Sequence, residues 1–204
     1  MSAPDALAVR VGRALLARAA RLAIAESCTG GLVGARVTGV PGSSRYLLGG
    51  VVAYHNRAKV ALLRVPVGML RRHGAVSAPV AAAMARGARR IFSAEVAVGV
   101  TGIAGPGGAS AGKPVGLVHI AVCGLGRTRC RSACFAGDRR RVREQAADLA
   151  LNMLLNHLEE EPPAAIRGGR APGVAARNNR GCAVIPEEHR LRPRCSPRVR
   201  TVVF

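Results

Sequence analysis

The most informative stretch of this sequence is Leu22-Ala23-Ile24-Ala25-Glu26-Ser27-Cys28-Thr29-Gly30-Gly31, where a strand pattern changes to a helix pattern. Its first four residues are apolar, which is typical of a short buried strand, and residues 32–37 suit a helix. Ser27 lies at the turn between them, where the N–H groups of a first helical turn can hold an anion. A serine at this place also serves as an ordinary helix cap. The segment therefore predicts a strand-to-helix turn and leaves two interpretations of Ser27, a nucleophile and a cap.

Helical and strand patterns alternate along the rest of residues 1–161. This alternation predicts an α/β fold, namely a three-layer α/β/α sandwich around a mostly parallel mixed sheet. The last two strands are close in sequence and are expected to be adjacent and antiparallel. The expected strands are 22–25, 46–54, 95–100, 115–122 and 128–135, and the expected helices lie near 7–15, 32–37, 56–63, 77–92 and from 138 onward.

The chain of 204 residues is long enough for one domain with a real core. We assign residues 1–161 to that domain. Residues 162–204 contain scattered Arg, Pro and Gly without a sustained period, so we expect this tail to be disordered.

The formal net charge of +20 raises the question of a nucleic-acid partner. Of the 31 basic residues, however, 29 are Arg, and they are scattered over the expected helix faces. This distribution favours a solvated surface and makes nucleic acid an unlikely partner. The two lysines are Lys59 and Lys113, and a buried lysine can lose its proton whereas arginine cannot.

The six cysteines indicate neither a metal site nor a disulfide framework. Only Cys130 and Cys134 are close in sequence, and no second pair of metal-ligand spacing accompanies them. No segment reaches the roughly 18 apolar residues of a membrane span. The N-terminal region is interrupted by arginines and does not read as a signal peptide, so we expect a cytoplasmic protein without membrane contact.

Seven short segments follow one another in a specific order. They are Ala-Glu-Ser-Cys-Thr-Gly-Gly at 25–31, Val-Pro-Gly-Ser-Ser at 40–44, Tyr-His-Asn-Arg-Ala-Lys at 54–59, His-Gly-Ala-Val-Ser at 73–77, Val-Thr-Gly-Ile-Ala-Gly-Pro-Gly-Gly at 100–108, Lys-Pro-Val-Gly at 113–116 and Phe-Ala-Gly-Asp-Arg at 135–139. In these segments the chain resembles the CinA C-terminal domain family, whose stand-alone members are nicotinamide-nucleotide amidases. The resemblance implies hydrolysis of nicotinamide mononucleotide to nicotinic acid mononucleotide and ammonia, which recycles pyridine nucleotides. It also implies a homodimer and no requirement for a metal or cofactor.

Hydrolysis of a carboxamide needs a nucleophile, a base and donors for the developing oxyanion. The five histidines have no evident acidic partner, so a serine–histidine–aspartate arrangement is not apparent. By position in the family's motifs, Ser27 would be the nucleophile, Lys59 the base and Tyr54 a group that relays a proton or positions the amide. An exposed helix lysine is the alternative for Lys59. Cys28, next to Ser27, is an alternative nucleophile.

A phosphate-bearing substrate also needs an anion site. The glycine-rich loop at 101–108 follows an expected strand, and its backbone N–H groups can converge on an anion. A tight connection between two strands is the alternative interpretation of this loop. The candidate substrate-binding residues are Thr29, Gly30, Gly31, Thr101, Gly102, Gly105, Gly107 and Arg143.

Two further functions compete with the amidase. One is a nucleotide-binding module of the CinA type without turnover. The other is a nucleic-acid-associated protein that uses its Arg-rich tail. A steep salt dependence of DNA binding, abolished by cutting the chain at residue 161, would favour the latter.

Overall fold

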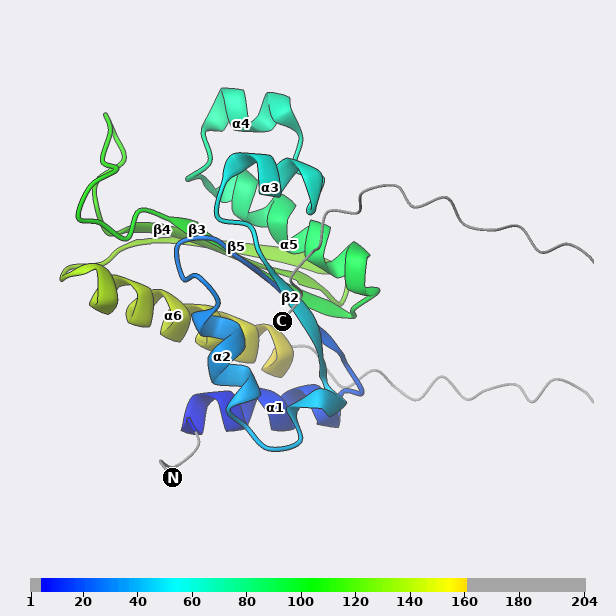
Figure 1. Ribbon diagram of the computed structural model, residues 1–204. Helices are drawn as coiled ribbons and strands as arrows, with labels where there is room; N and C mark the ends of the chain where they lie inside the picture. Colours follow the sequence, from blue (N-terminus) through cyan, green and yellow to red (C-terminus); the bar gives the residue numbers. More distant parts are fainter. Residues whose placement is uncertain (1–4, 161–204) are drawn as a thin grey trace, which may run out of the picture. The chain divides into compact units, whose positions relative to one another are not determined.

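The computed structural model describes residues 5–160, so the prediction of a disordered tail at 162–204 lies outside the described residues. Within these residues the chain forms five strands, six α-helices and one short 3₁₀ turn, whose arrangement is drawn in Figure 1. The strands are β1 (Leu22–Glu26), β2 (Leu47–Val52), β3 (Val96–Gly102), β4 (Leu117–Gly124) and β5 (Arg127–Cys134). The helices are α1 (Ala6–Ala17), α2 (Leu32–Thr38), α3 (Asn56–Ala61), α4 (Val67–His73), α5 (Ala78–Phe92) and α6 (Arg139–Glu159), with a 3₁₀ turn η1 at Ser43–Arg45.

The five strands form one mixed sheet in the order β2-β1-β3-β4-β5. β1 pairs in parallel with both β2 and β3, whereas β4 pairs antiparallel with β3 and β5. Four strands therefore share one direction and β4 alone opposes them. The predicted α/β class, the mostly parallel mixed sheet and the antiparallel final pair are confirmed.

Helices cover both faces of the sheet. Figure 1 shows α1, α2 and α6 on one face and α3, α4 and α5 on the other. The core is built largely from Ala, Val and Leu, as the scarcity of aromatic residues requires. The α5 backbone packs very close to β3, because a Cβ atom on Gly99 would lie 2.3 Å from the Ala81 carbonyl oxygen. The core between α5 and the sheet is therefore built mainly from small side chains.

The sequence patterns missed α4. This seven-residue helix buries none of its residues and has no side-chain cap, so it carries neither a core stripe nor a start signal. The pattern placed the start of the last helix correctly, because Asp138 caps α6 by accepting a hydrogen bond from the Arg141 N–H at 2.8 Å.

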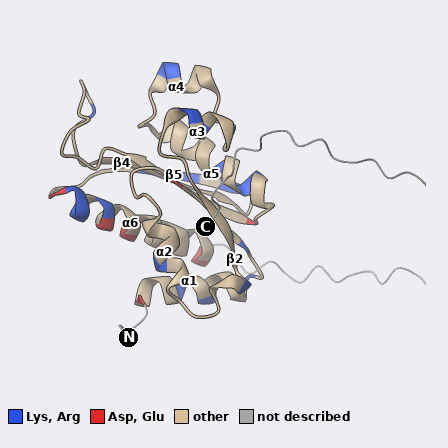
Figure 2. Ribbon diagram, in the orientation of Figure 1, with Lys and Arg blue, Asp and Glu red and all other residues tan. Residues whose placement is uncertain are grey.

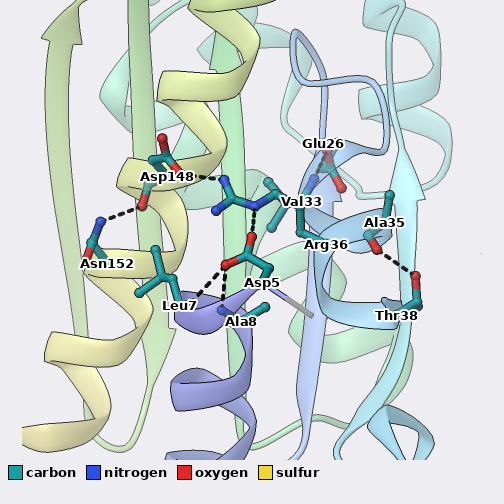
Figure 3. Close-up of polar contacts among 10 residues, drawn as sticks. All are labelled: Asp5, Leu7, Ala8, Glu26, Val33, Ala35, Arg36, Thr38, Asp148 and Asn152. Carbon is teal, nitrogen blue, oxygen red and sulfur yellow. Dashed lines mark hydrogen bonds and ion pairs between the residues drawn. The ribbon is translucent and has the colours of Figure 1, made fainter. Parts of the chain in front are cut away.

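One arginine ties together the three helices of the α1/α2/α6 layer. Arg36 of α2 donates hydrogen bonds to Asp5 at 2.5 Å and to Asp148 at 2.6 Å (Figure 3). Asp5 also caps α1 through the N–H groups of Leu7 and Ala8. This layer holds α2, which follows Ser27, in a fixed position against α6.

The sheet creates a crevice at the carboxyl ends of β1 and β3. The chain leaves β1 toward β2 on one side and leaves β3 toward β4 on the other. Adjacent strands whose connections diverge in this way open a crevice at the sheet edge, which is the common ligand position in open α/β sheets. The Ser27 turn and the glycine-rich loop both begin at this edge.

Candidate active site

Glu26, the last residue of β1, fixes the turn that carries Ser27. Its carboxylate accepts hydrogen bonds from the N–H groups of Gly31, Val33 and Gly34 at 2.9, 3.1 and 2.9 Å. Figure 3 shows this side chain directed at the start of α2. Since a carboxylate stabilises the positive end of a helix, Glu26 is the effective cap of α2.

This contact changes two sequence-based interpretations. Ser27 is not the helix cap, because Gly31 is the N-cap residue and no side chain of its own completes the cap. Nor are the N–H groups at 30–31 open to a ligand, since Gly31 donates to Glu26 and Gly30 donates to the Ser27 carbonyl. The helix start predicted as an anion site is therefore already occupied by a side chain of the protein.

Lys59 comes from α3 and reaches Ser27 across the crevice edge. Its Nζ atom lies 3.0 Å from Ser27 Oγ, 3.0 Å from the Ala53 carbonyl oxygen and 3.3 Å from that of Tyr54. The Lys59 residue is only 2% exposed, so the interpretation as an exposed helix lysine is wrong. Burial lowers the pKa of Lys59 below its usual 10.5.

The three partners of Lys59 suit a neutral amine as well as an ammonium. Two of them are carbonyl oxygens, which can only accept, so two N–H bonds of a neutral amine point at Ala53 and Tyr54. The remaining tetrahedral position, the lone pair, then faces the Ser27 hydroxyl. The geometry can therefore pass a proton from Ser27 Oγ to Lys59 Nζ.

Tyr54 lies beside this pair, but its hydroxyl points elsewhere. The Tyr54 residue is 58% exposed, and its hydroxyl accepts a 2.6 Å hydrogen bond from Arg139 Nη2. Arg139 Nη1 also donates to the Gly105 carbonyl at 2.9 Å. A direct proton relay from the Tyr54 hydroxyl to Lys59 is not arranged, because the backbone carbonyl of Tyr54 makes that contact.

A pocket of about 220 Å³ brings these groups together. Ser27, Tyr54 and Arg139 line it together with the loop after β3. The backbone N–H groups of Ala104, Gly105, Gly107 and Gly108 have no acceptor within residues 5–160. The pocket is lined by Ser27, Cys28, Tyr54, Gly102, Ile103, Ala104, Gly105, Gly107, Gly108 and Arg139.

The pocket lining does not include five of the predicted binding residues, namely Thr29, Gly30, Gly31, Thr101 and Arg143. Thr101 donates its hydroxyl to the Ala75 carbonyl at 2.9 Å. Arg143 donates from Nε and Nη2 to the Thr29 carbonyl at 3.1 and 2.8 Å, so it braces the Ser27 turn instead of clamping a ligand. Thr29 is fully buried and its hydroxyl has no hydrogen-bond partner among the described residues.

Arg139 lines the pocket, whereas the sequence analysis predicted Arg143 as the binding arginine. The signal was present, since Gly137-Asp138-Arg139 is part of the last recognised segment. The two arginines are one helical turn apart on α6, and only the structure separates the one that lines the pocket.

Cys28 lines the pocket but is poorly suited to attack a substrate. Burial raises the pKa of its thiol to about 11, so little thiolate exists near neutral pH. A second hollow of about 330 Å³ lies between α2 and β2, and its ionisable lining residue, Glu26, is engaged as the cap of α2. The Ser27 pocket is therefore the candidate active site.

Two absences apply to the described part of the chain. No group of three or more His, Cys, Asp or Glu side chains is placed to hold a metal ion. None of the helices within residues 5–160 combines the length and apolar character that a membrane crossing requires.

Comparison with known proteins identifies the family. The CinA C-terminal domain matches residues 4–158, which is most of the chain. The chain belongs to this family. A CinA-like protein of Anaeromyxobacter sp. strain Fw109-5 is 52% identical over 152 residues, which make up 74% of this chain and 37% of that protein. This CinA-family chain thus spans little more than a third of the length of that relative.

Solved structures agree with the fold. The competence damage-inducible protein A (ComA) of Klebsiella pneumoniae is 36% identical, with a TM-score of 0.74, and the match covers 76% of this chain and 97% of that one. The competence/damage inducible protein CihA of Agrobacterium tumefaciens is 38% identical, with a TM-score of 0.72, covering 78% of this chain and 100% of that one. The CinA-type domain in both is nearly the entire chain.

Proposed function

We propose that this CinA-family chain is a nicotinamide-nucleotide amidase that converts nicotinamide mononucleotide to nicotinic acid mononucleotide and ammonia. The observation that carries the proposal is the 3.0 Å contact between buried Lys59 Nζ and Ser27 Oγ at the wall of a pocket. A serine activated by a neutral lysine is a sufficient nucleophile for an amide.

The reaction proceeds in two halves. Ser27 Oγ forms a bond to the carboxamide carbon while its proton passes to Lys59 Nζ. The C–N bond then breaks, the leaving nitrogen takes that proton and departs as ammonia, and an ester to Ser27 remains. Water then bonds to the ester carbon and gives a proton to Lys59 Nζ. The bond from that carbon to Ser27 Oγ breaks, Lys59 returns the proton to Oγ, and the acid product loses its remaining proton to solvent as the carboxylate.

The pocket also supplies candidate donors for the negative charges of the substrate and the oxyanion. The unpartnered N–H groups of residues 104–108 line one side, and Pro106 interrupts them. The Arg139 guanidinium also lines the pocket and donates to the Gly105 carbonyl of this loop. Such donors suit a phosphate or a developing oxyanion, because they need not reorganise during the reaction.

The test is to incubate the purified chain with nicotinamide mononucleotide and to measure ammonia and nicotinic acid mononucleotide together. We expect release by the wild type and a loss of about three or more orders of magnitude in Ser27→Ala. Lys59→Arg should be equally inactive, since arginine keeps its proton.

The same assay separates the proposal from its rival. Saturable binding of the nucleotide without ammonia release by the wild type would indicate a binding module without turnover. Full activity in Lys59→Arg would remove lysine from the role of base.

A further inference from the structure

Three arginines form a cluster of positive charge on the C-terminal half of α5. Arg86, Arg89 and Arg90 are exposed, and none of them pairs with a carboxylate within residues 5–160. Arg89 and Arg90 use single N–H groups on the carbonyls of Ala94 and Leu63. Figure 2 shows blue segments on this part of α5. Most of the donor capacity of these guanidinium groups is thus unused.

Two of these arginines surround a hollow between α5 and the β4–β5 hairpin. The hollow has a volume of about 360 Å³ and is lined by Arg86, Arg89, Cys123, Gly124, Gly126, Arg127 and Thr128. A neighbouring hollow shares Arg86 and Arg89, and its acidic lining residue, Glu95, is bound by Arg21 at 2.9 and 3.0 Å. Within residues 5–160, no acidic side chain lines the hollow beside the hairpin.

The charges of Arg86 and Arg89 affect cysteines on the neighbouring strands. Burial raises the pKa of the Cys123 thiol, and the nearby charges of Arg89 and Arg86 act against that rise. Arg86 acts in the same way on Cys130, whose pKa is also raised chiefly by burial. Both guanidinium groups therefore lie within electrostatic reach of the strands that form the floor.

The hairpin turn supplies a further donor at the rim. The Gly126 N–H has no acceptor among the described residues, and Gly126 adopts a φ of 82° that favours glycine. Arg127 also lines the hollow, but its Nη2 donates to the His157 carbonyl of α6 at 2.8 Å. The hollow thus presents two guanidinium groups, one backbone donor and the Thr128 residue.

This place is separate from the Ser27 pocket. Gly124, at the hairpin, pairs with Val96 at the start of β3. Ser27 instead bonds to Val100, near the other end of the same strand. The two sites lie at opposite ends of the sheet.

We propose that the hollow around Arg86, Arg89, Gly126 and Thr128 binds a small anion through a phosphate group, free or terminal on a metabolite. Guanidinium groups hold phosphate oxygens in pairs of parallel hydrogen bonds, and the absence of a lining carboxylate leaves their charge uncompensated. The hollow of about 360 Å³ beside the hairpin has room for one compact group. This site is independent of the amidase reaction.

The test uses the full chain, inorganic phosphate and pyrophosphate at 150 mM salt, where diffuse surface charges are largely screened. Amide resonances are followed by NMR during each titration. We expect saturable shifts of Gly126 and Thr128. We expect binding at these amides to weaken at least tenfold in the double variant R86Q/R89Q.

The matched control is R13Q/R72Q, which removes the same charge from exposed arginines that line neither hollow. Its affinity should stay within twofold of the wild type. Equal loss in both variants, or no saturable shift at Gly126 and Thr128 in the wild type, would overturn the proposal. Spectra without ligand verify that each variant is folded.

Discussion

Lys59 Nζ lies 3.0 Å from Ser27 Oγ although 32 positions separate the two residues in the sequence. Parallel pairing explains the meeting, because Glu26 at the end of β1 stands beside Val52 at the end of β2. The residues that follow the two strands therefore emerge at the same edge of the sheet. α3 then turns back so that Lys59 enters the interior beside Ser27.

Replacing Cys28 tests which side chain attacks. Cys28→Ala should keep activity within about threefold of the wild type, since a thiol whose pKa is about 11 contributes little thiolate near pH 7. Ser27→Ala serves as the matched change one residue earlier and should be inactive. Ammonia release by both variants gives the comparison, and the reverse ranking would assign the attack to the thiol.

The activity should rise with pH as Lys59 loses its proton. Burial penalises the ammonium form, so its pKa lies below 10.5 and the neutral base becomes abundant below that pH. We expect an acid limb in the pH profile of kcat/KM at the pKa of Lys59. The free energy of unfolding should also increase with pH between this pKa and 10.5, where the unfolded chain binds more protons.

The lysine can be titrated directly because the chain contains only Lys59 and Lys113. NMR of the lysine side-chain Cε groups gives two signals, which Lys113→Arg assigns. The Lys59 signal should titrate at the same pH as the acid limb. An acid limb that is unrelated to this signal would place the base elsewhere.

Much of the fold follows from local pattern. The buried runs at β1 and β3 and the Asp138 cap predict elements whose positions agree with the structure within about two residues. The CinA family match covers residues 4–158, and the roles predicted for Ser27 and Lys59 come from their positions in the family's motifs. The homodimer implied by that resemblance stays a prediction.

The remaining site features depend on orientation, which sequence spacing does not encode. Arg139 and Arg143 differ by one helical turn, and one lines the pocket while the other holds the Thr29 carbonyl. The sequence suggests that the Gly31 N–H is available to a ligand, whereas in the structure it donates a hydrogen bond to the Glu26 carboxylate.

Arg139 should act on substrate binding more than on chemistry. It lines the pocket and contacts Tyr54 and the Gly105 loop, but it touches neither Ser27 nor Lys59. Arg139→Gln should raise KM roughly tenfold or more with a smaller change in kcat. Tyr54→Phe removes only the partner hydroxyl and should have a weaker effect of the same kind. A collapse of kcat at unchanged KM would assign Arg139 to the reaction itself.

Glu26→Gln should destabilise the protein, because the three N–H groups at the start of α2 would lose a carboxylate and face an amide with one acceptor oxygen. Glu26 is 3% exposed, and hydrogen bonds to buried charged groups are stronger than neutral ones. We expect a loss of about 2–4 kcal/mol in the free energy of unfolding, measured by urea denaturation.

Glu95→Gln is the matched control, since Glu95 and its partner Arg21 have side chains that are 37% and 51% exposed. Loss of an exposed ion pair costs about 1 kcal/mol or less. A Glu26→Gln variant as stable as Glu95→Gln would mean that α2 keeps its start without the carboxylate. The Ser27 turn would then be held mainly by Arg143 and by the Val100 carbonyl that accepts from the Ser27 N–H.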